Sequence, residues 1–154
     1  MKKIHPITFA LTQIIPKPAA AICAEVADVT RWSEFTGYSI LPGIERSVYE
    51  LRTEEMVGSR VRVRNMDGSQ HVEEITEWVV GQRIVMKMHD FTPPLSRLAT
   101  HFVEMWTFVE QGPDTLVTRS FQLFPQGVWT RPLLWGISLL FRRAIGRQLG
   151  EMAG

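Results

Sequence analysis

The stretch that decides the fold is RPLLWGISLLFRRAIGRQL, residues 131–149. Its uncharged run from Pro132 to Phe141 has ten residues, whereas a helix needs about 20 apolar residues to cross a bilayer. The stretch is therefore too short for a membrane span. Two interpretations remain: a helix on a membrane surface, or a helix that closes a hydrophobic cavity in a globular domain.

The same stretch is amphipathic when it is plotted as a helix. Pro132 suits the first turn, and the arginines near the C-terminal end complement the helix dipole. Trp135 and Leu139 lie opposite the main apolar face, so we expect loops, a symmetric dimer or a membrane surface to cover them. The main apolar face carries Leu133, Leu134, Ile137, Leu140, Phe141, Ala144, Ile145 and Leu149.

Length and composition indicate one globular domain over residues 1–154, with 45% hydrophobic and 21% charged residues. A net charge of +1 argues against a nucleic-acid partner. The only cysteine, Cys23, excludes an intramolecular disulfide and favours the cytoplasm. Pro6, Thr8 and Thr12 interrupt any signal-peptide core, so the N-terminal stretch is expected to be part of the mature fold.

Period-two alternation predicts a strand at Ile7–Thr12, and an alanine-rich stretch with Pro18 in its first turn predicts a short helix. A second helical turn is expected to carry Trp32 and Phe35. Turn signals then separate six further strands. These strands are predicted at residues 43–51, 59–65, 70–80, 83–89, 99–110 and 115–124.

The hairpin around Asp67-Gly68 is the clearest local signal, because both residues tolerate the positive φ angles of tight hairpin turns. Consecutive strands should therefore pair antiparallel. Val72 and Ile75 are three residues apart, so one face of their strand cannot hold both without an irregularity such as a bulge. The register of that strand stays open.

The order of elements is a strand, two short helices, six strands and one long helix. A seven-stranded antiparallel sheet has one apolar face to cover, and only the last helix is long enough to cover it. We therefore predict an α+β fold in which the sheet curves around the C-terminal helix.

This order resembles the START-like superfamily, the SRPBCC group that includes the polyketide cyclase/dehydrase and lipid transport families. The likeness rests on VTRWSEF (29–35), VGSRVRV (57–63), VEEITEWVVGQRIVMKM (72–88), DTLVTRSFQLFP (114–125) and RPLLWGISLLFRRAIGRQLGEM (131–152). It implies a helix-grip fold with a mostly apolar cavity for lipids, sterols or polyketides. Members include enzymes, carriers and sensors, so the resemblance assigns no catalytic residue. Phe35 stands where relatives often have a second tryptophan, which alters the shape of the pocket.

The cavity-lining residues follow from strand parity and from the apolar face of the last helix. Met86 and Met88 would adapt the lining to varied ligands, because thioether side chains repack readily. The predicted ligand-binding residues are Trp32, Phe35, Met86, Met88, Phe102, Glu104, Trp106, Ile137 and Phe141.

Glu104 is the polar residue of greatest interest, because it shares a strand face with Phe102, Trp106 and Phe108. Burial would raise its pKa and suit it to acid–base work or to a hydrogen bond with a ligand. The alternative is a structural ion pair with an arginine such as Arg119.

No motif predicts a metal or another cofactor: the sequence has no HExxH, no Cys/His cluster, no phosphate-binding glycine loop and no GxSxG elbow. His89 and Asp90 are adjacent on a strand and should point in opposite directions, so they are poor candidates for catalysis.

Three functions stay open. The first is binding or transport of a hydrophobic small molecule in the cavity. The second is a polyketide cyclase/dehydratase-like enzyme that uses Glu104 as acid and base. The third is a module that docks on a membrane or on another protein through Trp135, Leu139 and the nearby arginines.

Overall fold

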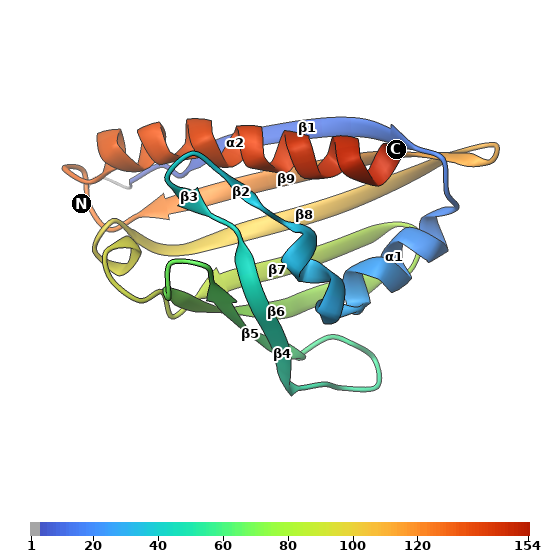
Figure 1. Ribbon diagram of the computed structural model, residues 1–154, viewed down its shortest axis with the longest axis horizontal. Coiled ribbons are helices and arrows are strands. Elements are labelled where there is room, and N and C mark those ends of the chain that lie inside the picture. Colours follow the sequence, from blue (N-terminus) through green and yellow to red (C-terminus); the bar gives the residue numbers. More distant parts are fainter. Residues whose placement is uncertain (1–3) are drawn as a thin grey trace.

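The fold is described by a computed structural model that covers residues 4–154 (Figure 1). Its strands are β1 (Ile7–Ile15), β2 (Gly37–Tyr38), β3 (Leu41–Pro42), β4 (Ile44–Leu51), β5 (Arg60–Asn65), β6 (Gln70–Val79), β7 (Arg83–His89), β8 (Ala99–Gln111) and β9 (Asp114–Pro125). Its α-helices are α1 (Ala19–Ala27) and α2 (Arg131–Ala153), and its 3-10 helices are η1 (Val29–Glu34) and η2 (Leu95–Arg97).

Seven strands form one antiparallel sheet in the order β1-β9-β8-β7-β6-β5-β4. Helix α2 lies lengthwise over the β1 and β9 side of this sheet, while α1 and η1 lie beside its other half (Figure 1). The predicted α+β class, the seven strands and the long C-terminal helix are confirmed. Pro18 differs slightly from the prediction, because it is the extended residue before α1 (φ −67°, ψ 149°) and not part of its first turn.

The β2–β3 hairpin is an element that the sequence did not predict. Its first residue, Gly37, has a φ of 75°, and a Cβ atom there would lie 2.2 Å from the Leu41 carbonyl oxygen, so only glycine fits. The Tyr38 ring lies against α2, with the guanidinium carbons of Arg143 and Arg147 at 5.7 and 5.4 Å from its centre. The hairpin therefore adds a wall beside the helix.

An irregularity in β6 settles the register that the sequence left open. The pairing with β7 shifts directly after Ile75, which itself pairs with Met86. Because paired residues share a face, Ile75 and the alternate residues His71 and Glu73 face the same side as Met86. Val72 and Ile75 thus lie on opposite faces, and the bulge does not bring them together.

The buried face of α2 is narrower than the sequence predicted. Leu134, Ile145 and Leu149 are fully buried, but Leu133 is 60% exposed. The helix meets the sheet through Leu134 and residues one turn apart from it, so Leu133 is rotated away from the contact.

Trp135 and Leu139 were expected to be covered, but no other part of residues 4–154 covers them. Their side chains are 54% and 44% exposed. No helix in this part of the chain is both long and apolar enough to cross a membrane.

Candidate functional site

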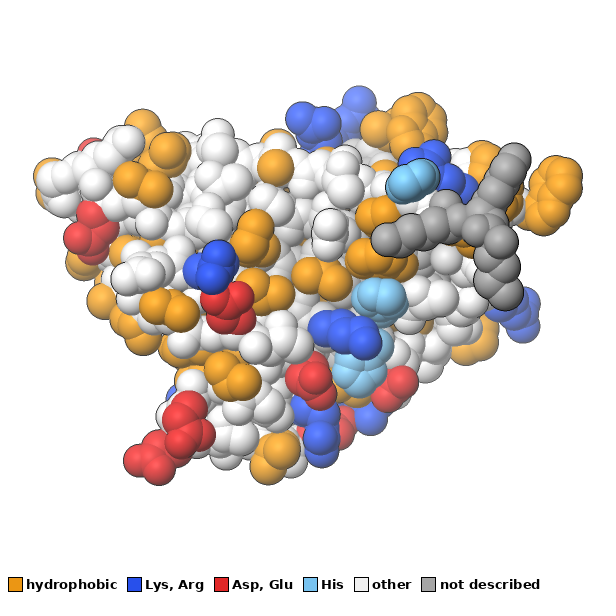
Figure 2. Space-filling model, turned by 180° about the vertical axis from the view of Figure 1, so that it is seen from behind, with side chains coloured by type: hydrophobic (Ala, Val, Ile, Leu, Met, Phe, Trp, Pro, Cys, Tyr) orange, Lys and Arg blue, Asp and Glu red, His pale blue; other side chains and the backbone are white. Residues whose placement is uncertain are grey.

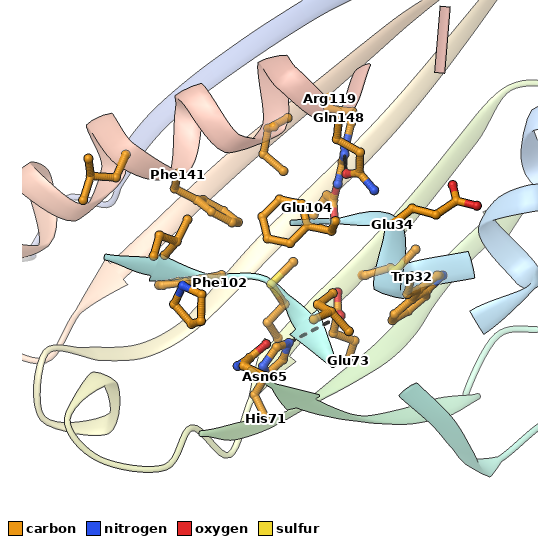
Figure 3. Close-up of a pocket in the computed structure, with 18 of the residues that line it drawn as sticks. Trp32, Glu34, Asn65, His71, Glu73, Phe102, Glu104, Arg119, Phe141 and Gln148 are labelled. Atoms are coloured by element: carbon orange, nitrogen blue, oxygen red, sulfur yellow. Dashed lines mark hydrogen bonds and ion pairs between the residues drawn. The ribbon is translucent and has the colours of Figure 1, made fainter. Parts of the chain in front are cut away.

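A pocket with a volume of about 480 Å³ lies between the sheet, α2, η1 and the β2–β3 hairpin (Figure 3). All nine residues predicted to bind ligand contribute to its wall. They are Trp32, Phe35, Met86, Met88, Phe102, Glu104, Trp106, Ile137 and Phe141. The structure places these residues around one space, and contact with a ligand stays a prediction.

Phe141 is the centre of the aromatic wall. It projects from α2 toward the sheet (Figure 3), and its ring centre lies 4.8 Å from that of Phe121 and 6.1 Å from that of Phe102. Phe35, next to η1, meets it edge-on at 6.4 Å. The Trp32 indole N–H donates a 2.9 Å hydrogen bond to the Val26 carbonyl, which fixes the ring at the rim. Rigid aromatic groups from separate elements thus shape the pocket.

The polar end of the pocket is a buried ion pair between β8 and β9. Arg119 Nε and Nη2 lie 2.6 and 2.5 Å from Oε2 of Glu104. Arg119 Nη1 donates a 2.5 Å hydrogen bond to Gln148 Oε1 on α2, and the guanidinium carbon lies 4.1 Å from the centre of the Trp106 ring. The arginine partner expected for Glu104 is therefore present, and the same arginine ties the sheet to the C-terminal part of α2.

Burial dominates the titration of Glu104, which is only 2% exposed. Loss of solvation raises the pKa of its carboxyl group from 4.5 to about 7. The charge of Arg119 opposes this shift, and the nearby carboxylate of Glu73 adds to it. Glu104 can therefore gain or lose a proton near neutral pH, as acid–base catalysis or a proton-coupled binding step would require.

This raised pKa predicts a pH-dependent stability difference between the protein and its Glu104→Gln variant. The folded carboxyl binds its proton more tightly than the unfolded one, so protonation stabilises the fold at low pH. That stabilisation is lost as the pH rises from about 4.5 to about 7. We expect urea titrations to show the unfolding free energy of the wild type falling relative to Glu104→Gln over this range. A difference that is independent of pH would contradict the assignment.

A second polar pair, His71 and Glu73, lies on β6, on the same face of the sheet as Glu104 and two strands away from it (Figure 3). His71 Nε2 is 3.4 Å from Glu73 Oε2, and Glu73 is buried. The sequence did not predict this pair, because the two possible registers of β6 place His71 and Glu73 on different faces of the sheet. The Asp67-Gly68 turn nevertheless indicated the register, because it pairs Val63 of β5 with His71 of β6. Since Val63 faces inward, His71 must face inward too.

His89 and Asp90, which the sequence made poor candidates for catalysis, lie outside the pocket. Their side chains do not point in opposite directions as expected, because Asp90 follows the end of β7 and has a φ of 55°. His89 Nδ1 and Asp90 Oδ2 are 3.5 Å apart at the end of β7, and neither lines the pocket wall. Within residues 4–154, no three His, Cys, Asp or Glu side chains are grouped closely enough to hold a metal ion. The ionisable side chains that line the pocket include Glu104, Arg119, His71 and Glu73.

The sequence itself decides the family. The profile of the family described as "Polyketide cyclase / dehydrase and lipid transport" matches residues 6–154. The chain belongs to this family. Its START-like resemblance is thereby confirmed, and membership implies either binding and transport of a hydrophobic ligand or a cyclase activity. Among curated proteins, none matches the chain significantly in sequence.

Solved structures with this fold align with almost the whole chain. A START superfamily protein from Mycobacterium smegmatis has a TM-score of 0.72 at 13% identity, covering 95% of this chain and 96% of that chain. The Zhui aromatase/cyclase from Streptomyces sp. R1128 has a TM-score of 0.71 at 13% identity, with coverages of 96% and 94%. Major latex-like protein 151 from Panax ginseng has a TM-score of 0.69 at 14% identity, with coverages of 97% and 99%. At these identities, the likeness shows a shared fold only.

Proposed function

We propose that the protein binds a hydrophobic small molecule with a polar group, such as a lipid, a sterol or a polyketide, in the pocket between the sheet and α2. The observation that carries this proposal is the pocket itself, about 480 Å³ in volume and walled mainly by apolar side chains, among them several aromatic rings and methionines. Pockets for small ligands are typically about 300–1,000 Å³ and mostly apolar, with few polar groups.

The polar groups of the pocket indicate where the ligand's own polar group would lie. The contacts of Arg119 with Glu104 and Gln148 use three of its five N–H groups. A hydroxyl or carbonyl oxygen could therefore accept a hydrogen bond from this arginine without breaking the ion pair. Met86 and Met88 on the same wall suit ligands of varied shape.

A pocket-filling substitution on α2 tests the proposal. Ile137 lines the pocket, whereas Leu133 lies one turn earlier on the same helix, outside the pocket and 60% exposed. We expect Ile137→Trp to weaken the binding of cis-parinaric acid, a fluorescent fatty acid, by about tenfold or more. Leu133→Trp, the matched control, should bind like the wild type. Circular dichroism would verify that both variants fold, and equal binding by the two would place the probe elsewhere and refute the proposal.

Acid–base catalysis is a second candidate function, favoured by the Glu104 carboxyl group with its pKa of about 7 inside the pocket. Its carboxylate would accept a proton from a carbon next to a carbonyl group. The resulting acid would protonate a departing hydroxyl group, which leaves as water. For an enzyme of this class, Glu104→Gln should abolish conversion of a poly-β-ketone substrate, followed by absorbance, while binding persists. Conversion at the wild-type rate by Glu104→Gln would exclude this role for Glu104.

A further inference from the structure

The start of α2 and the loop before it expose an unusual group of side chains, which we call the α2-start surface: Val128, Trp129, Arg131, Trp135, Leu139 and Arg142. Trp129 is 95% exposed and Trp135 is 54% exposed. Arg131, Trp135, Leu139 and Arg142 border one shallow groove between β1 and α2. In Figure 2, hydrophobic and basic side chains gather at the upper right, over this end of the molecule. Large apolar and cationic groups therefore share one exposed surface.

The charge at this end is one-sided, although the whole chain carries a net charge of only +1. The sequence has no Asp or Glu at positions 1–24, 91–103 or 115–150. These segments meet in the fold, since Arg131 Nε donates to the His5 carbonyl at 3.3 Å and the Gln126 N–H donates to the Leu98 carbonyl at 2.9 Å. The segments that meet around the start of α2 thus carry arginines and, among their described residues, no Asp or Glu.

The arginines of this end differ from three exposed arginines on the sheet. Arg62, Arg64 and Arg83 form ion pairs with glutamates on the same or neighbouring strands. Within residues 4–154, Arg131 and Arg142 form no such ion pair, and both are exposed. Their charges are therefore available to an external anion.

The α2-start surface also adjoins one rim of the pocket. The Gln126 side chain donates a 2.9 Å hydrogen bond to the Ser96 carbonyl in η2, and its backbone N–H bonds to Leu98. Leu95 and Leu98 of the same segment line the pocket. A binding partner in contact with Trp129 would be separated from this part of the pocket wall only by the loop that contains Gln126.

We propose that the α2-start surface docks onto a bilayer that contains anionic phospholipid. Tryptophan and leucine side chains gain free energy at the boundary between head groups and acyl chains, and arginines are attracted to anionic head groups. The absence of carboxylates removes the repulsion that such a bilayer would otherwise exert. This proposal goes beyond ligand binding and does not depend on it, because none of the six residues of the surface lines the pocket.

Co-sedimentation of the full chain with vesicles tests the proposal. We expect binding to phosphatidylcholine vesicles that contain about 30 mol% phosphatidylglycerol, and at least about tenfold weaker binding to pure phosphatidylcholine. Trp129→Ser combined with Trp135→Ser should weaken binding by about tenfold or more. Arg131→Gln and Arg142→Gln should each weaken it about fivefold and reduce its sensitivity to salt.

Matched controls come from exposed residues at other places. Val48 and Val109 are apolar and exposed, and Arg46 and Arg60 are exposed arginines on the β4 and β5 edge. Val48→Ser with Val109→Ser, and Arg46→Gln with Arg60→Gln, should bind vesicles like the wild type. Thermal unfolding would verify that the variants of the α2-start surface stay folded, since Trp135 is partly buried and Arg131 donates a hydrogen bond to the His5 carbonyl.

Three results would overturn the proposal: no binding to either vesicle, equal binding to both, or equal weakening by the control variants. A dimer that dissociates in the Trp129→Ser variant, seen by analytical ultracentrifugation without vesicle binding, would instead assign the surface to a second copy of the chain. Variants of the α2-start surface should still bind cis-parinaric acid. This measurement distinguishes a failure of the membrane-docking proposal from a failure of the proposed ligand binding.

Discussion

Replacing Arg119 with methionine should lower the free energy of unfolding by about 3–5 kcal/mol at about pH 8. Methionine keeps an unbranched apolar stem between Trp106 and Phe121, but it removes the charge and the hydrogen bonds to Glu104 and Gln148. The Glu104 carboxyl group would then be buried without a partner, either as an unpaired carboxylate or as an acid whose protonation at this pH costs free energy. An uncompensated buried charge is the most costly product of breaking such a pair.

The pH dependence and a double variant test this explanation. Without Arg119 the pKa of Glu104 should rise further, so at about pH 5 the carboxyl is protonated and the loss in stability should be smaller. The double variant Glu104→Leu/Arg119→Met removes both charges and should be more stable than Arg119→Met alone at about pH 8. Denaturant unfolding monitored by tryptophan fluorescence measures both effects. If the double variant were the less stable of the two, an unpaired Glu104 charge could not be the cause.

Phe121→Ala should be the second severe substitution, with a loss of about 3–5 kcal/mol in the free energy of unfolding. Phe121 is 1% exposed; its ring stacks on Phe9, at 5.0 Å, and meets Phe141 edge-on, at 4.8 Å. Its removal would leave a cavity walled by side chains that the sheet and α2 hold in place. Such surroundings collapse only partly, so the cost includes the cavity.

Phe141→Ala provides the comparison, because this ring is only partly buried and one side of it faces the pocket. Its removal enlarges a space that already exists, so we expect a loss of about 1–2 kcal/mol. Thermal and urea unfolding of the two variants would give the order of the two losses. A larger loss for Phe141→Ala than for Phe121→Ala would contradict this description of the core.

Most of the sheet was predictable because its strands are long enough for period-two alternation and are separated by clear turn residues. The β2–β3 hairpin was not predictable in this way, since two-residue strands have no period. It depends on the φ of 75° at Gly37 and on packing against α2, which is distant in sequence. Local sequence carries no information about such a contact.

The pocket wall was predictable wherever parity along a strand decides which side chains point inward, as for Met86, Met88 and Phe102. Parity gives no answer where two apolar residues are three positions apart, and His71 and Glu73 were missed because the spacing of Val72 and Ile75 left two registers of β6 open. Gln148 was missed for another reason. Its contact with Arg119 depends on the rotation of α2 relative to β9, which the helical period alone does not determine.

Strand order also has a consequence for biosynthesis. Strands β4 to β9 are neighbours in sequence as well as in the sheet, so each can pair soon after it leaves the ribosome. Strand β1 is different, since Ile7 pairs with Leu123, more than 100 residues later. Such distant pairing slows folding. During translation, the earliest strand of the sheet must therefore wait until nearly the whole domain has emerged, and in that interval its backbone N–H and C=O groups bond only to water and are free to pair with another nascent chain.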